Sequence, residues 1–320
     1  MVSVALATYN SEKYIIQQLE SIVNQTIKVD EVIIQDDFST DNTIKIITEF
    51  IKLNKITNWR IERNNINKGY IWTFKEAIRK CKGDIIILCD HDDIWLKNKN
   101  EIIINEFKKN KNILALATSF IQIDEFGNEI KTRNLFGHAN NNLIRHHIYK
   151  NKLNKMNFKD VAIFNISPGC TCAFSSSIKM QLLEYDYKLP HDLQIVNIAA
   201  LKNGLYYLDI VTTKYRIYSN NTIGLGHQSI YDKRLELARN GLKEKEEIKK
   251  ILENIDCNNV EAQKLINKII RAFRLREKLM ENKNILKYGF LALFNSLGLN
   301  KLYESVLMDI ATIIIKKDRK

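Results

Sequence analysis

Three aspartates lie within four positions in the stretch IIILCDHDDIW at residues 85–95. Asp90, Asp92 and Asp93 directly follow an apolar run of the kind that forms a buried strand. Carboxylates at this spacing repel one another, so we expect a cation or a shared proton among them. Mg²⁺ and Mn²⁺ prefer hard oxygen ligands and bridge one or two protein carboxylates to phosphates. The cluster is therefore a candidate divalent-metal site.

Polar residues also follow two earlier strand-like segments. Thr8 and Tyr9 end the first segment, and Asp36 and Asp37 end the second. Because open α/β sheets bind ligands at the carboxyl ends of parallel strands, we expect all these side chains to converge. No G-x-G-x-x-G follows the first strand, and no G-x-x-x-x-G-K-[ST] occurs. The pattern favours a nucleoside-diphosphate ligand whose phosphates contact a protein-bound divalent cation. Other carboxylates would accept hydrogen bonds from its ribose or base.

The segments that must position these residues alternate between strand and helix signals. Strand-like segments are expected at residues 2–10, 30–37, 58–64, 84–90, 113–124, 161–176 and 205–221. Apolar residues at helical spacing fall at residues 11–26, 40–54, 70–81 and 189–204. Repeated β-α units with short connections and continuous apolar strands predict an α/β fold, with a mostly parallel sheet flanked by helices.

The pattern changes at about residue 227, after which only helical periodicity occurs. We expect amphipathic helices at 228–255 and 258–282, followed by a more apolar segment at 284–316. The chain is therefore divided into an α/β domain at 1–226 and a C-terminal helical extension at 227–320. The extension either packs on the first domain or forms a homodimer, or it attaches peripherally to an anionic inner membrane surface.

The composition of the chain limits which binding partners and which cellular location are expected for the protein. Residues 231–320 hold 20 Lys and Arg against 13 Asp and Glu, and so carry +7 of the net charge of +12. No helix-turn-helix, zinc-finger or RNP signature accompanies this charge, so nucleic acid is not expected as a partner. The sequence begins without signal-peptide character and holds no apolar run of about 18 residues, which predicts a cytoplasmic protein. The five cysteines, an odd number, are expected to be reduced.

Four motifs in order resemble a known family: VALATYNSEKYIIQQLESIVNQT, VIIQDDFSTDNT, NKGYIWTFKEAI and GDIIILCDHDDIW. They are similar to the inverting family 2 glycosyltransferases of GT-A fold, and in particular to the bacterial rhamnosyltransferase-like branch of cell-surface polysaccharide synthesis. The resemblance covers about residues 1–225. It implies a nucleoside-diphosphate-sugar donor, such as a UDP- or dTDP-sugar, and a hydroxyl acceptor on a glycan or lipid-linked oligosaccharide.

The resemblance also implies roles for residues on the donor side. Asp90-His91-Asp92 corresponds to the D-x-D motif, in which Asp92 would hold Mn²⁺ or Mg²⁺ and Asp90 would reach the ribose or the sugar. Relatives commonly have Gln at the position of His91. The other donor-binding residues implied are Thr8 and Tyr9 in the first loop, Asp36 and Asp37 of the D-D-x-S motif, and Asn67 and Gly69 of the N-x-G loop.

The acceptor side resembles the family in two further segments. The HD pair in LPHDLQIVNIAA implies that Asp192 is the catalytic base, which takes the proton of the acceptor hydroxyl. KYRIYSNN resembles Y-R-x-H-x-x-N, which makes Arg216 a candidate contact of the diphosphate. Tyr218 stands where relatives have a His that ligates the metal in some cases. His227 is the candidate substitute ligand.

Several of these residues also have purely structural interpretations. Asp93 could cap a helix at 94–107, and Asp192 follows a proline at a helix start, where an acid is a good cap. Cys170 and Cys172 are too closely spaced for a zinc site and are expected to be small buried residues. Two other functions compete with sugar transfer. One is nucleotidyl transfer, although no Gly-rich basic loop follows the first strand, and the other is non-catalytic nucleotide or glycan binding.

Overall fold

The computed structural model of the protein describes residues 1–144, 147–218 and 229–318. These residues form two compact units. The first comprises residues 1–157, 165–186 and 190–218, and the second comprises 158–164, 187–189 and the described chain after residue 218. The expected division between residues 226 and 227 falls outside the described residues, so it stays a prediction.

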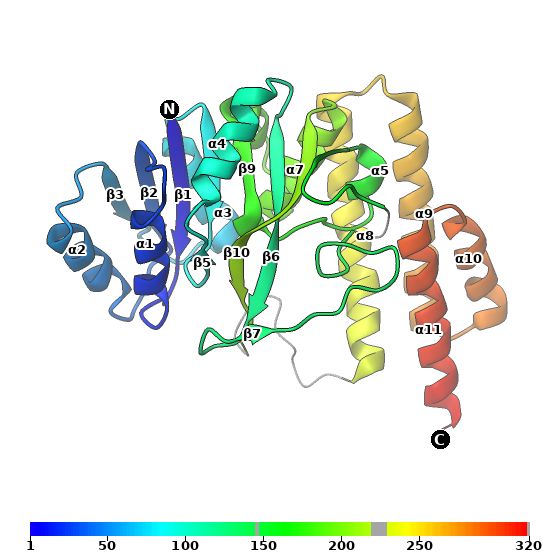
Figure 1. Ribbon diagram of the computed structural model, residues 1–320. Helices are drawn as coiled ribbons and strands as arrows, with labels where there is room; N and C mark the ends of the chain where they lie inside the picture. The colour runs from blue at the N-terminus through cyan, green and yellow to red at the C-terminus, as the bar shows by residue number, and fades with distance from the viewer. Residues whose placement is uncertain (145–146, 219–228, 319–320) are drawn as a thin grey trace. The chain divides into compact units, whose positions relative to one another are not determined.

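A ten-stranded mixed sheet forms the centre of the first unit (Figure 1). Its order is β3-β2-β1-β4-β9-β6-β10-β5, with β7 paired to β6 and β8 paired to β10. The ladders that join β1 to β2 and β4, β2 to β3, and β6 to β10 are parallel, and the other ladders are antiparallel. The strands are β1 (Val2–Thr8), β2 (Glu31–Asp36), β3 (Trp59–Arg63), β4 (Ile85–Cys89), β5 (Ile94–Trp95), β6 (Ala115–Ile123), β7 (Glu129–Ile130), β8 (Leu153–Met156), β9 (Cys172–Ser175) and β10 (Leu205–Arg216).

Helices cover both faces of this sheet, as the sequence predicts. One face packs against α1 (Ile15–Val23), α2 (Thr43–Leu53) and α4 (Lys99–Lys109). The other packs against α3 (Tyr70–Lys80) and α7 (His191–Leu201), and α6 (Lys179–Glu184) contacts these two helices. In α1, Ile15, Leu19 and Ile22 lie at helical spacing and are almost fully buried, so burial of this apolar stripe stabilises the helix. The α/β class is confirmed.

Two stretches differ from the sequence expectation. Residues 161–176 do not form one strand, because Pro168 fixes its φ angle and lacks an N–H donor. The stretch instead contains the end of the short helix α5 (Phe158–Val161), a 3₁₀ turn at Gly169–Thr171 and β9. Asp93 does not cap a helix, since β5 follows it directly and α4 begins only at Lys99.

The second unit is helical beyond residue 229. It contains α8 (Ile230–Ile255), α9 (Val260–Asn282), a π-helical turn (Ile285–Gly289), α10 (Phe290–Ser296) and α11 (Asn300–Asp318). The two amphipathic helices are therefore confirmed, and the apolar segment after them is broken at Gly298, whose φ of 76° favours glycine. Within the described residues, no helix is long and apolar enough to cross a membrane.

Candidate functional site

The loops after β1 and β2 are joined by side-chain hydrogen bonds. The parallel register places Thr8 beside Asp36, and Thr8 Oγ1 donates to Asp36 Oδ1 at 2.9 Å. Asp36 also accepts from the backbone N–H of Ser39 at 2.8 Å, and Ser39 Oγ accepts from the N–H of Asn10 at 2.9 Å. Thr8 and Asp36 are buried, whereas Tyr9, the first residue of the loop after β1, is 44% exposed. The buried pair therefore orders the loops, and its predicted contacts with a nucleotide stay predictions.

Asp37 orders a third loop at the same edge of the sheet. Its carboxylate accepts from Asn64 Nδ2 at 2.7 Å and from the backbone N–H groups of Lys68 at 2.8 Å and Gly69 at 2.7 Å. Gly69 has a φ of 83°, a left-handed conformation that glycine adopts without steric cost and that lets its N–H reach Asp37. Asn67 is exposed on this loop. Asp37 of the D-D-x-S segment is therefore hydrogen-bonded to the N-x-G loop, and the predicted contacts of both segments with a nucleotide stay predictions.

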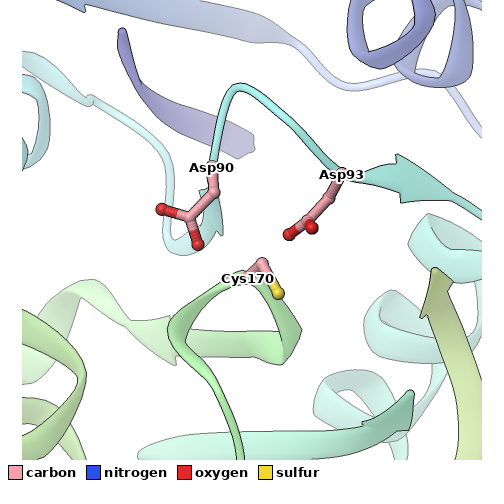
Figure 2. A group of neighbouring side chains, drawn as sticks. All are labelled: Asp90, Asp93 and Cys170. Atoms are coloured by element: carbon pink, nitrogen blue, oxygen red, sulfur yellow. The ribbon is translucent and has the colours of Figure 1, made fainter. Parts of the chain in front are cut away.

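The acidic cluster lies in the loop between β4 and β5. Figure 2 shows Asp90 and Asp93 at the two ends of this loop, with Cys170 facing the space between them. One potential ligand atom from each of these three residues lies within 4.8 Å of the others. Burial and then the charges of Asp93, Asp92 and Asp192 raise the pKa of Asp90 well above its usual range. Burial and the charge of Asp92 raise the pKa of Asp93 to about 7. The cluster therefore favours binding of a proton or a cation.

Asp92 is held by two hydrogen bonds from the last residue of β10 and from a residue just after this strand. Tyr218 donates its hydroxyl hydrogen to Asp92 Oδ2 at 2.9 Å, and Arg216 Nε donates to the Asp92 carbonyl at 2.7 Å. Tyr218, which stands where relatives have His, thus orients the carboxylate expected to bind metal. His227, the expected substitute ligand, lies outside the described residues.

Arg216 is 1% exposed and acts as a clamp on this loop. Its backbone N–H donates to Asp93 Oδ1 at 2.9 Å. Its guanidinium also donates to the carbonyls of Asp124 and Glu125, each at 3.2 Å, and to Gln17 Oε1 at 2.6 Å. These bonds direct the side chain toward protein carbonyls. Contact with a diphosphate, which the sequence predicts, would require some of them to be exchanged and stays a prediction.

Lys99 was missed by sequence reasoning. This lysine is fully buried at the start of α4, where Nζ donates to the carbonyl of Cys170 at 2.5 Å and to Thr213 Oγ1 at 3.0 Å. Burial lowers its pKa, and the nearby charges of Asp93 and Asp90 oppose that change. Nothing in the local pattern distinguishes Lys99 from a solvated lysine, because only the packing of α4 brings it near the acids.

Asp192 belongs to the same site as the acidic cluster. It lies in the first turn of α7, where Asn165 Nδ2 donates to Oδ2 at 2.7 Å and the N–H of Leu193 donates to Oδ1 at 2.8 Å. A Cβ atom on Gly169 would lie 3.4 Å from Asp192 Cβ, and the next residue, Cys170, contacts the acids. The 3₁₀ turn therefore lies near both Asp192 and the acidic cluster, and the charge of Asp192 contributes to the raised pKa of Asp90.

His191, the residue before Asp192, is buried in the protein rather than exposed to solvent. Its ring stacks on Phe74 with 3.7 Å between centroids, and neither ring nitrogen has a hydrogen-bond partner within the part of the chain that the structure describes. Burial lowers its pKa to about 3, so the imidazole is neutral. His191 therefore fixes the start of α7 by packing.

A comparison with known protein families identifies the chain. Residues 3–179, more than half of the sequence, match the family described as glycosyl transferase family 2. The chain belongs to this family. Among curated relatives, the family 2 chain is 27% identical over 311 residues to the dTDP-rhamnosyl transferase RfbG of Shigella flexneri, covering 90% of this chain and 100% of that protein. It spans less than half of the length of five other curated relatives that it matches.

Solved structures share the fold of this family 2 chain. S. aureus TarS 1-349 in complex with UDP-GlcNAc matches with a TM-score of 0.58 and 19% identity, covering 98% of this chain and 81% of that chain. The mannosyltransferase PcManGT from Pyrobaculum calidifontis, in complex with GDP-Man and Mn²⁺, matches with a TM-score of 0.55 and 16% identity, covering 98% and 84%. Identity at this level shows the fold alone.

The potential metal ligands in the acidic cluster of the family 2 chain suit a hard divalent cation. Asp93 Oδ2 is buried and has no hydrogen-bond partner among the described residues, and the carboxylates of Asp90 and Asp92 are only partly buried. Cys170 also faces the cluster, but burial raises the pKa of its thiol, and a neutral thiol is a poor ligand for Mg²⁺ or Mn²⁺. The carboxylates are therefore the candidate ligands.

Proposed function

We propose that the chain is an inverting glycosyltransferase that uses a nucleoside-diphosphate sugar and a divalent cation. Its acceptor would be a hydroxyl of a cell-surface polysaccharide or a lipid-linked glycan. The observation that carries this proposal is the oriented Asp192 carboxylate in the same site as the cluster of Asp90, Asp92 and Asp93. Family membership supports it, as does the name of RfbG, a dTDP-rhamnosyl transferase. The cytoplasmic location and homodimer remain predictions from the sequence.

Asp192 would be the base of the transfer. Its carboxylate takes the proton of the acceptor hydroxyl while that oxygen forms a bond to the anomeric carbon. The bond from this carbon to the diphosphate oxygen breaks on the opposite side, and the diphosphate leaves with the electron pair. Asn165 and the N–H of Leu193 hold the two carboxylate oxygens at 2.7 and 2.8 Å, which fixes the direction from which the proton is taken.

The donor would lie against the loops after β1, β2 and β4. A divalent cation held by Asp92, with Asp90 as a further ligand or as a contact of the ribose, would offset the charge of the diphosphate. Tyr218 orients Asp92 through its hydroxyl, and Arg216 fixes the backbone of that loop. Asp37 holds the loop of Asn67 and Gly69 in place for the nucleotide.

Two measurements test this function. Thermal stability would be measured against UDP, dTDP, GDP, CMP and ADP, each with and without Mn²⁺ or Mg²⁺, because a ligand that binds the native state raises its stability. We expect a metal-dependent rise with at least one diphosphate, lost in Asp92→Ala and kept in the exposed control Glu20→Ala. The absence of any nucleotide effect would contradict the proposal and favour a glycan-binding protein without catalysis.

The second measurement addresses the base directly. With the donor identified by the first, we expect Asp192→Asn to lower sugar transfer at least about a thousandfold while the nucleotide-induced rise in stability persists. The amide keeps the size of the side chain and removes its basicity. If this variant transferred sugar at the wild-type rate, a residue other than Asp192 would be the base. If the wild-type protein instead released diphosphate from a nucleoside triphosphate, the result would favour nucleotidyl transfer.

A further inference from the structure

A strip of large apolar side chains is exposed on the π-helical turn and α10 of the second unit. Leu286, Phe290 and Phe294 follow one another at every fourth position, so they share one face of this helical segment. Their exposed fractions are 82%, 63% and 69%, and the strip is extended by Leu291 at 49% and Leu297 at 50%. Contiguous exposure of this kind marks a surface that contacts a protein partner, a ligand or a membrane.

The opposite face of the same segment is firmly packed. Ala292 is fully buried in a core with Leu279, Val306 and Ile313, and Leu293 packs against that core. In Figure 1, α10 lies beside α9 and α11, which are the helices that it contacts. Since the segment is anchored by its inner side chains, the exposed strip is a fixed feature of the folded unit.

The charged residues within the segment that carries the strip are all basic. Residues 283–299 contain Lys283 and Lys287 and neither Asp nor Glu. At the end of α10, Lys268 Nζ donates to the carbonyl of Leu297 at 2.6 Å, which places a third ammonium group beside the strip. Phenylalanine and leucine on one face, with flanking lysines, are typical of helices that lie in the interface of an anionic bilayer.

We propose that this strip inserts into the headgroup region of an anionic phospholipid bilayer. The lysines would contact the acidic headgroups, and the phenyl and leucyl side chains would leave water for the acyl boundary. A second copy of the chain fits this surface less well. It would bring the same lysines together, and residues 283–299 offer no carboxylate to pair with them. Bilayer binding does not require sugar transfer, so it goes beyond the function proposed above.

Vesicle flotation of the full chain, without nucleotide, tests this proposal. We expect about a hundredfold tighter binding to vesicles of phosphatidylcholine with phosphatidylglycerol than to phosphatidylcholine alone, because each of the three lysines contributes roughly a factor of five. High salt should weaken the binding, because it screens the lysines. The double variant Phe290→Ser/Phe294→Ser should lose at least tenfold in affinity and keep the wild-type melting temperature, because both side chains are mostly exposed.

A matched control is available in the first unit. Phe126 and Phe136 are exposed by 79% and 104%, and their double change to serine should leave vesicle binding unaltered. Three results would overturn the proposal. In the first, the wild-type protein binds neither kind of vesicle. In the second, the variant Phe290→Ser/Phe294→Ser binds the anionic vesicles as tightly as the wild type. In the third, the wild type binds no vesicles but is a dimer by light scattering, and the double variant is a monomer. Failure of the transfer assay alone would leave the inference standing.

Discussion

Arg216→Lys should destabilise the first unit, because a lysine cannot reproduce the guanidinium clamp. Arg216 donates to the Asp92 carbonyl and to the carbonyls of Asp124 and Glu125, and it also bonds Gln17. A lysine ammonium can replace one or two of these bonds. Loss of two charge-assisted hydrogen bonds, at about 1.5 kcal/mol or more each, predicts a loss of roughly 3 kcal/mol in the free energy of unfolding.

The assay is thermal melting, with urea unfolding as a second measure. A loss of roughly 3 kcal/mol corresponds to a fall of about 6–12 °C in melting temperature for a unit of this size. The control Arg79→Lys alters an arginine whose side chain is 50% exposed and bonds Glu76, so it should change the melting temperature by under about 2 °C. If Arg216→Lys melts within about 2 °C of the wild type, Arg216 does not act as a clamp, and its assignment as a diphosphate contact gains weight.

Three further outcomes are expected. Tyr218→Phe removes the hydroxyl that orients Asp92 and should weaken the metal-dependent nucleotide effect about tenfold, measured by titration of Mn²⁺. His191 has a pKa of about 3, against an ordinary value of 6.5. The unfolded chain therefore binds more protons between these pH values, and stability falls as the pH falls through that window. His191→Phe should flatten this part of the slope in urea unfolding at several pH values. Gly241→Ala should destabilise the second unit by about 1–3 kcal/mol in thermal melting, because the new Cβ would lie 2.3 Å from Phe273 Cε1.

Each of these changes has a matched control that should have little effect. Tyr149→Phe alters an exposed tyrosine, and His147→Gln alters an exposed histidine, so neither should change metal affinity or the pH slope. Asn240→Ala introduces alanine beside Gly241 at an exposed helical position and should be neutral or slightly stabilising. Equal effects of a variant and its control would refute the corresponding interpretation. An unchanged pH slope in His191→Phe would mean that the imidazole is protonated in the folded state.

Local sequence patterns were sufficient for the loops that carry the acids. Asp36 and Asp37 end a continuous apolar strand, and Asp90 follows another, so the parallel sheet had to bring both to one edge. The side chains of Asp36 and Asp37 could not be assigned in this way. Their bonds to Thr8, Ser39, Asn64 and the Gly69 loop depend on strand register and on loop paths.

The amino-acid sequence by itself determined the α/β class, the polar edge of the sheet and the amphipathic helices at the C-terminus, because these follow from periodicity and from short connections. Tertiary structure decided which groups meet there. Pro168 is a local signal against the expected strand, but only the fold placed the 3₁₀ turn after it so that Cys170 lies by the acids. The packing of α4 buried Lys99 near them, and the end of β10 placed Arg216 and Tyr218 on the loop of Asp92. Such contacts join residues far apart in the chain, so no local pattern records them.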